Sequence, residues 1–434
     1  MNISFTKHTL GNGLDVLIHE ERDCPIVAVN LWYHVGSKNE RPDHTGFAHL
    51  FEHLMFEGSQ HHDKGYFQPL QGAGATLNGS TNADRTNYWE VVPSGAFELA
   101  LWMESDRMGY LLPALTDAKL RNQRDVVLNE RRQNYENRPY GMAPMALLAA
   151  LFPPDHPYHW ATIGEVADLE TVQLDEVHAF FRRYYHPGNA SLAIAGDVDT
   201  NEALALAREY FEDIAPGEQV AQVDADTRLD ARARVYFEDR VELPRLYLAW
   251  LTPAMFADGD ADLDLATDLL ANGKTSRLYR RLVFDERIAT DVSASQNSRE
   301  IAGYAQITAT AAPGRSLDEL ERAIDDEIAR LAADGPSADE IERGRVQAES
   351  QFMFRLQTVG GFGGKSDQLN AYNVFLGDPG YFDRDLARYQ VVTDSSLRAT
   401  VGRFLNHARR VTLSIVPQGR AALAASDSSL VAVA

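Results

Sequence analysis

The chain has 434 residues, of which 44% are hydrophobic and 24% charged, and its net charge is −22. These proportions are those of a soluble globular protein, and the length favours two domains, since one hydrophobic core seldom extends over so many residues. The acidic balance argues against general binding to nucleic acid or to an anionic membrane, because either would need clustered positive charge. The one cysteine, Cys24, allows neither an internal disulfide nor a thiolate metal cluster.

The amino-terminal stretch lacks the basic region and the following apolar run of a signal peptide. No apolar run approaches the roughly 18 residues that a membrane-spanning helix needs. We therefore expect a cytoplasmic protein without a membrane partner.

The first predicted element is a hairpin. Residues 9–14 supply the turn glycines, residues 14–19 have the composition of a strand, and residues 26–35 continue as a further strand. From residue 47 the period changes, and apolar side chains recur three and four positions apart, as on an amphipathic helix: Phe47, Leu50, Phe51, Leu54 and Met55. Residues 92–110 and 115–135 are further predicted helices.

The second half of the chain repeats the plan of the first. Residues 172–199 read as a helix, a turn and an apolar strand, and residues 392–419, which lie 220 positions later, have the same order. A second similarity relates residues 54–58 to residues 269–273 at almost the same offset. Two similarities at one offset indicate an internal duplication.

The duplication and the composition together predict the domain boundaries. We expect an amino-terminal domain over residues 1–215 and a homologous carboxy-terminal domain over residues 235–434. Residues 216–234 are polar, begin with Pro-Gly and lack periodicity, so they are the predicted linker.

A possible metal site lies in the helix predicted from residue 47, where the sequence reads His49-Leu50-Phe51-Glu52-His53. Residues four apart lie on one face of a helix, so both imidazoles can reach one ion. Glu52 borders that face and can accept a proton from the water that a zinc ion activates. Paired histidines can also be ordinary surface or core residues, so the motif by itself does not decide between the two interpretations.

Catalytic zinc needs a third protein ligand, and Glu130 is a suitable candidate. It lies in a long predicted helix, 77 residues after His53. The motif and this spacing together resemble the inverzincin family, which includes pitrilysin, insulin-degrading enzyme and the mitochondrial processing peptidase. The resemblance extends over nearly the whole chain and is closest in kind to the catalytic subunit of the processing peptidase and its bacterial two-chain relatives.

The resemblance implies a function for each of these residues. His49, His53 and Glu130 would bind one Zn²⁺ per chain, and Glu52 would be the general base of a metalloendopeptidase. The segment from Asn78 through Gly79 to Thr81 would be an edge strand that pairs with the peptide substrate; from the sequence alone it could equally be an ordinary strand beside a turn. The implied fold is α+β, with two homologous domains, each a mainly antiparallel sheet packed with helices, arranged as half of a clam shell.

The chain departs from the family in its supporting residues. Gln123 stands seven positions before Glu130, where relatives often have a glutamate, so the support of the third ligand is electrostatically weaker. Val283 and Thr290 occupy the positions of an arginine and a tyrosine that polarise the substrate carbonyl in self-sufficient members. In the second half, the positions equivalent to the metal motif hold Asp264, Thr267 and Asp268.

The replacements at Val283 and Thr290 predict that this chain is the catalytic subunit of a heterodimer. A homologous partner without zinc would then donate the arginine and tyrosine. Two alternatives remain: a homodimer or monomer that uses other donors, such as Arg277 or Tyr279, and a catalytically impaired scaffold of the same fold.

Overall fold

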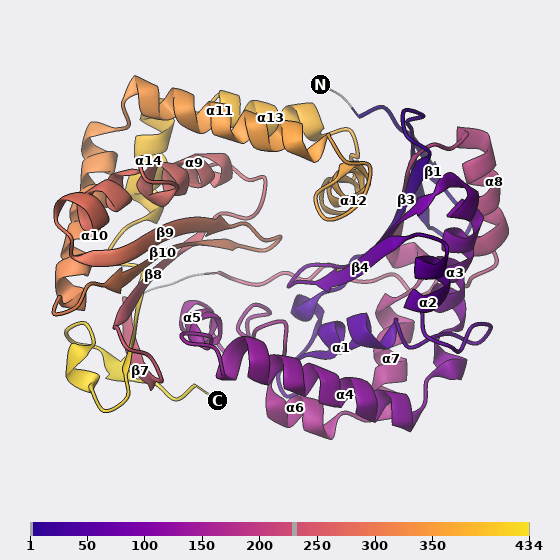
Figure 1. The fold of residues 1–434 in the computed structure, drawn as a ribbon, viewed down its shortest axis with the longest axis horizontal. Helices are drawn as coiled ribbons and strands as arrows, with labels where there is room; N and C mark the ends of the chain where they lie inside the picture. Colours follow the sequence, from indigo (N-terminus) through magenta and orange to yellow (C-terminus); the bar gives the residue numbers. More distant parts are fainter. Residues whose placement is uncertain (1–2, 228–231, 434) are drawn as a thin grey trace. The chain divides into compact units, whose positions relative to one another are not determined.

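The computed structural model describes residues 3–227 and 232–433, which form two compact units, each built on a six-stranded sheet (Figure 1). The first unit consists of Met1–Asn129, Ala161–Val223 and Gln351–Arg384. The second unit consists of Glu130–Trp160, Asp224–Ser350 and Asp385–Ala434. Within the described residues, no helix is both long enough and apolar enough to cross a membrane.

The sheet of the first unit has the strand order β1-β2-β6-β3-β5-β4. All its neighbouring strands are antiparallel except β2 and β6, which are parallel. The strands are β1 (Thr6–Thr9), β2 (Asp15–Glu20), β3 (Ile26–Tyr33), β4 (Thr76–Thr81), β5 (Thr86–Pro93) and β6 (Ala190–Gly196). The strand β4 therefore forms one edge of this sheet.

Helices cover both faces of the first sheet. On one face α1, α3 and α8 contact the strands, and on the other face α12 packs across β2, β6 and β3. The helices of this unit are α1 (Phe47–Leu54), α2 (Phe67–Gly72), α3 (Phe97–Tyr110), α4 (Asp117–Arg131), α6 (Val166–Thr171), α7 (Leu174–Tyr184), α8 (Thr200–Phe211) and α12 (Lys365–Leu376). A covered sheet of this kind explains why β3 and β6 are apolar along nearly their whole length.

The sheet of the second unit has the strand order β12-β7-β11-β8-β10-β9. From its second strand onward, the order and the strand directions match those of the first sheet, with β11 parallel to β7 and antiparallel to β8. The strands are β7 (Ala233–Asp239), β8 (Arg245–Thr252), β9 (Ala289–Asn297), β10 (Gly303–Ala311), β11 (Val411–Pro417) and β12 (Ser429–Leu430). The shared topology confirms the duplication predicted from the sequence.

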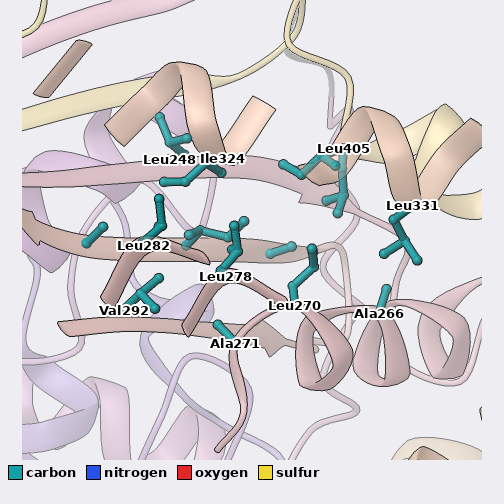
Figure 2. Packing of buried hydrophobic residues seen from close by; sticks show 14 of the residues in the cluster. Leu248, Ala266, Leu270, Ala271, Leu278, Leu282, Val292, Ile324, Leu331 and Leu405 are labelled. Atoms are coloured by element: carbon teal, nitrogen blue, oxygen red, sulfur yellow. The ribbon is translucent and has the colours of Figure 1, made fainter. Parts of the chain in front are cut away.

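The second core lies between this sheet and three helices, α9, α10 and α14. In the view of Figure 2, Ala266 and Leu270 of α9 lie in the lower part of this core, and Leu248 and Ile324 lie in its upper part. The remaining helices are α5 (Ala143–Leu151), α9 (Asp260–Ala271), α10 (Leu317–Asp334), α11 (Ala338–Arg355), α13 (Phe382–Gln390) and α14 (Asp394–Phe404). The π-helical turn η6 (Tyr279–Asp285) adds Leu282 to this core.

The compact units differ from the predicted contiguous domains because the two halves of the sequence exchange equivalent helices. The helix α5 belongs to the first half of the sequence but packs on β8 and β11 of the second sheet, whereas α12 comes from the second half and packs on the first sheet. Asp367 of α12 is buried and accepts hydrogen bonds from Asn30, Trp32 and Asn87 of the first sheet. A carboxylate satisfied in this way holds α12 in one register.

Most predicted elements agree with the structure, and the differences lie at their ends. The predicted helix over residues 92–110 begins too early, because β5 continues through Val92 to Pro93 and α3 begins at Phe97. The helix predicted over residues 115–135 is α4, which starts at Asp117 and passes into a π-helical turn after Arg131. Part of the predicted linker, residues 228–231, lies outside the described residues, and β7 begins at Ala233.

Candidate metal centre and active site

The helix α1 presents the His-x-x-Glu-His motif on its one partly exposed face. Its apolar residues are buried, whereas His49, Glu52 and His53 are half-buried. The two imidazole rings have centroids 4.9 Å apart and are nearly perpendicular. The four-residue spacing thus places both histidines side by side, as predicted.

Glu130 lies in the last turn of α4 and completes the group. One ligand atom from each of His49, His53 and Glu130 lies within 4.8 Å of the others. Two imidazole nitrogens and a carboxylate oxygen are a donor set that suits zinc, whose ligand atoms lie about 3.4 Å apart in a tetrahedral site. The residues therefore fit the predicted ion in both chemistry and position.

The helix α4 is tied to the segment that follows α1. The side-chain amide of Gln123 donates to Glu57, which lies three residues beyond the end of α1, and Lys119 forms an ion pair with Asp63. Gln123 lies two helical turns before Glu130. It thus connects α4 to the segment that follows the motif helix, through an uncharged amide.

Asn134 is a supporting residue that the sequence analysis missed. Its amide Nδ2 donates to Glu130 Oε1 at 3.3 Å. Asn134 lies in the π-helical turn η4 (Arg132–Glu136), directly after α4. The four-residue spacing to Glu130 was the available signal, but a regular helix could not be assumed there.

The predicted substrate segment lies at the edge of the first sheet, beside the motif helix. Asn78, Gly79 and Thr81 belong to β4, which pairs with β5 on one side and contacts α1. The backbone N–H of Gly79 donates to Asn78 Oδ1 at 2.8 Å. A Cβ at Gly79 would lie 3.1 Å from both Phe56 and Tyr88, so glycine lets the edge strand pack closely on those rings.

Arg85, in the turn between β4 and β5, is the second residue that the sequence analysis missed. Its Nη1 donates to the backbone oxygen of Ser80 on the edge strand at 2.8 Å, and its guanidinium lies over Trp32. Burial lowers the pKa of Arg85, and the negative charge of Glu52 is among the influences that oppose this. A cation near Glu52 favours the carboxylate form that a general base needs.

The second half of the chain has a half-buried hydrogen bond where the first half has its His-x-x-Glu-His motif. Asp264 and Asp268 lie on α9, and the Tyr389 hydroxyl donates to Asp264 Oδ2 at 2.6 Å. Burial raises the pKa of Asp264 to about 7 and also raises that of Asp268. Thr267 is buried and donates to backbone oxygens of its own helix. These residues connect helices within the second unit.

The two positions of the missing arginine and tyrosine have structural contacts. Val283 packs against the second core, and Thr290 Oγ1 donates to Asp291 Oδ2 at 3.1 Å. The alternative donor Arg277 forms a bidentate ion pair with Glu340, at 2.7 and 2.8 Å. Tyr279, the other alternative, also packs against the core.

Fold and site together define a class of protein: a duplicated α+β chain with a His-x-x-Glu-His motif on one helix of its first half and a glutamate beside it. Comparison with protein families agrees with this class. Residues 15–156 match the insulinase (peptidase family M16) model, and residues 171–347 match the peptidase M16 inactive domain. The chain belongs to the insulinase (peptidase M16) family.

Individual relatives carry zinc-protease names. The chain is 27% identical to the zinc protease PqqE of Helicobacter pylori over 356 residues, which cover 81% of this chain and 80% of the relative. It is 29% identical to a zinc protease of Mycobacterium leprae over 328 residues, which cover 75% and 73% of the two chains.

Solved structures share the fold. A protease from Helicobacter pylori superposes with a TM-score of 0.87 at 23% identity, and the match covers 95% of this chain and all of the other. A peptidase M16 inactive domain from Pseudomonas fluorescens gives 0.84 at 21% identity, with 96% and 98% covered. The sheet-plus-helix architecture of both halves is therefore that of M16 peptidases.

Proposed function

We propose that the chain is a zinc-dependent endopeptidase that hydrolyses peptides or oligopeptides. The observation that carries the proposal is the grouping of His49, His53 and Glu130, with a possible base, Glu52, on the same helix. The zinc-protease names of the relatives support the same activity.

In this proposal His49, His53 and Glu130 hold the ion. When bound there, the ion would supply Lewis acidity that polarises the peptide carbonyl and lowers the pKa of water. Glu52 accepts the proton of the attacking water on its carboxylate and then delivers it to the leaving amine. The positive charge of Arg85 interacts with Glu52, and a nearby cation favours the carboxylate form of such a base.

The edge strand β4 would hold the scissile bond in place. An extended peptide that adds to β4 gains main-chain hydrogen bonds without demands on its side chains. The N–H of Gly79, which now donates to the Asn78 side chain, would be available once that side chain rotates. Asn78 therefore occupies one main-chain donor that a bound peptide would use.

We further propose that a homologous subunit completes the active site. Val283 and Thr290 cannot polarise a carbonyl, and Arg277 is already paired with Glu340. These contacts support a heterodimer over a self-sufficient homodimer, because Arg277, one of the chain's own alternative donors, is occupied. The intact motif argues against the third alternative, an impaired scaffold.

Peptide hydrolysis by the zinc-loaded chain, alone and with a homologous chain encoded beside it, tests both proposals. We expect cleavage of unstructured peptides that requires Glu52 and is greatly increased by the partner. The Glu52→Gln variant should keep zinc and lose at least about a hundredfold in rate. Full activity of the chain alone would contradict the heterodimer, and no activity with zinc and partner present would contradict the peptidase.

A further inference from the structure

A pocket of about 370 Å³ lies beside the turn that follows α4, the helix that carries Glu130. Its lining comes from the turn after α4, from α5 and from the strands β8 and β10, all within the second unit. Asn134, the residue that donates to Glu130, is one of the lining residues. One lining residue of the pocket thus contacts a residue of the candidate metal site directly.

Two arginines give this pocket an unusual charge for so acidic a chain. Arg138 and Arg245 both line it, and within the described residues neither forms an ion pair. Arg138 is exposed. Arg245 Nε donates to Thr310 Oγ1 at 2.8 Å, which fixes the guanidinium at the start of β8.

Aromatic rings complete the walls. The guanidinium of Arg245 lies 3.7 Å from the ring centre of Tyr140, a close cation–π contact. Tyr135 and Tyr247 also line the pocket. Burial raises the pKa of Tyr135, and the charge of Glu130 adds to this effect, which places that hydroxyl near the third ligand.

The backbone of the pocket is held in an uncommon conformation. Tyr140 has φ +60°, its N–H donates to Asp239 Oδ2, and its hydroxyl donates to the backbone oxygen of Leu243, both at 2.8 Å. At Gly141 a Cβ would lie 2.1 Å from the backbone oxygen of Tyr135, so only glycine fits. Such strain persists where surrounding contacts enforce it, and it is frequent at binding sites.

Two carboxylates near the pocket already accept hydrogen bonds. Asp239 accepts the N–H of Tyr140 and the N–H of Arg240, and Asp291 on β9 accepts the hydroxyl of Thr290. Their charges reach Tyr140, where the positive charge of Arg245 opposes them. The two arginines and three tyrosine rings line a pocket whose positive charge suits a planar anion. The amides of Asn134 and Gln306 already donate, to Glu130 and Thr308.

We propose that this pocket binds a carboxylate of the peptide substrate, between Arg138 and Arg245. The carboxylate would be the substrate's free C-terminus or the side chain of Asp or Glu. This inference rests on the proposed peptidase function and adds to it a preference for acidic peptides. The pocket is large enough to hold one residue of a peptide.

Binding of peptides to the zinc-loaded Glu52→Gln chain tests the pocket without turnover. The probes are short acetylated peptides of alanine, glycine and phenylalanine. One series carries a single glutamate or glutamine at successive positions and is amidated. The other has no charged side chain and ends in either a free carboxylate or an amide. The two series distinguish a side-chain carboxylate from a C-terminal one.

We expect at least one carboxylate peptide to bind about tenfold more tightly than its neutral twin, a difference of about 1.4 kcal/mol. Adding Arg138→Gln and Arg245→Gln should reduce this ratio below about twofold, and Arg245→Lys should restore part of it. Arg315→Gln, an exposed arginine elsewhere in the second unit, is the matched control and should leave the ratio unchanged.

Three results would overturn the proposal: equal affinity for every carboxylate peptide and its uncharged counterpart, no binding of any peptide, or an affinity ratio that is unchanged in the double variant. If Arg245→Gln unfolds, as thermal unfolding would show, the exposed Arg138→Gln carries the test alone. Hydrolysis by the zinc-loaded wild-type chain, with the homologous partner present, is measured in parallel. Hydrolysis without a carboxylate preference would contradict the pocket only, whereas a preference in binding without hydrolysis would contradict the peptidase only.

Discussion

The side-chain amide of Asn134 donates to Glu130 Oε1 at 3.3 Å, one turn beyond the third residue of the candidate metal site. Removing a residue that hydrogen-bonds to a metal ligand typically lowers metal affinity by about tenfold or more. We therefore expect Asn134→Ala to weaken zinc binding about tenfold, as measured by competition with a zinc chelator. Asn137→Ala, an exposed neighbour, is the control, and equal affinities for the two variants would refute this role for Asn134.

Gly79 is expected to be intolerant of even a methyl group. A Cβ would press on Phe56 and Tyr88 at 3.1 Å, and these rings pack in turn against Arg107. Gly79→Ala should lower the free energy of unfolding by about 1–3 kcal/mol in a urea titration. Gly95→Ala has open space around it and should change that free energy by less than about 0.5 kcal/mol. A neutral Gly79→Ala would show that the edge strand is not held by these rings.

Asp264 should make stability depend on pH. Its pKa is about 7 in the folded chain, above the ordinary value of 3.8, so the folded chain retains the proton between these values and the unfolded chain does not. The stability that this group contributes is therefore complete below about pH 4 and is lost as the pH rises through 7.

The Asp264→Asn variant removes this titration while an amide oxygen can still accept the Tyr389 hydroxyl. Relative to wild type, it should be stabilised by about 2 kcal/mol more at pH 8 than at pH 5. Thermal unfolding at the two pH values measures this difference, with the exposed Asp258→Asn as control. A difference independent of pH would refute a buried, proton-retaining Asp264.

A buried ion pair packs against the aromatic rings that contact α1. Arg107 pairs with Glu104 and lies between the rings of Tyr66 and Tyr88, and the Tyr88 hydroxyl donates to the backbone oxygen of Phe51 on α1. Burial, together with the charge of Glu104, raises the pKa of the neighbouring Glu90 well above its ordinary value.

Removing Glu104 should therefore recruit Glu90 as the new partner of Arg107. Glu104→Gln alone should cost less than the 3–5 kcal/mol typical of an uncompensated buried charge, whereas adding Glu90→Gln should restore the full cost. A double-mutant cycle in urea unfolding should give a coupling of at least about 1 kcal/mol. Additive effects would show that Glu90 cannot take over.

The sequence predicted what depends on spacing within one helix or on repetition. The four-residue interval between His49 and His53 needs only helical geometry, and the duplicated helix–turn–strand segments needed only comparison of the two halves. It could not predict which sheet each helix covers. The exchange of α5 and α12 depends on long-range contacts such as those of Asp367 with Asn30 and Trp32.

Asn134 and Arg85 could not be predicted for a related reason. Asn134 acts from a π-helical turn, and Arg85 acts from a tight turn whose position near Glu52 depends on how the hairpin packs. The end of β5 was also misjudged, because Val91 and Val92 suit a strand and a helix equally until Pro93 is seen to end the strand.

The central claim is that His49, His53 and Glu130 hold one zinc ion, and zinc content of the purified chain tests it most directly. Wild type and Glu52→Gln should each contain about one zinc per chain after exposure to the metal and removal of excess, because Glu52 is a base and not a ligand. His53→Ala and Glu130→Ala should retain less than about a tenth of that amount. A wild-type chain without zinc, or ligand variants with full zinc, would contradict the claim.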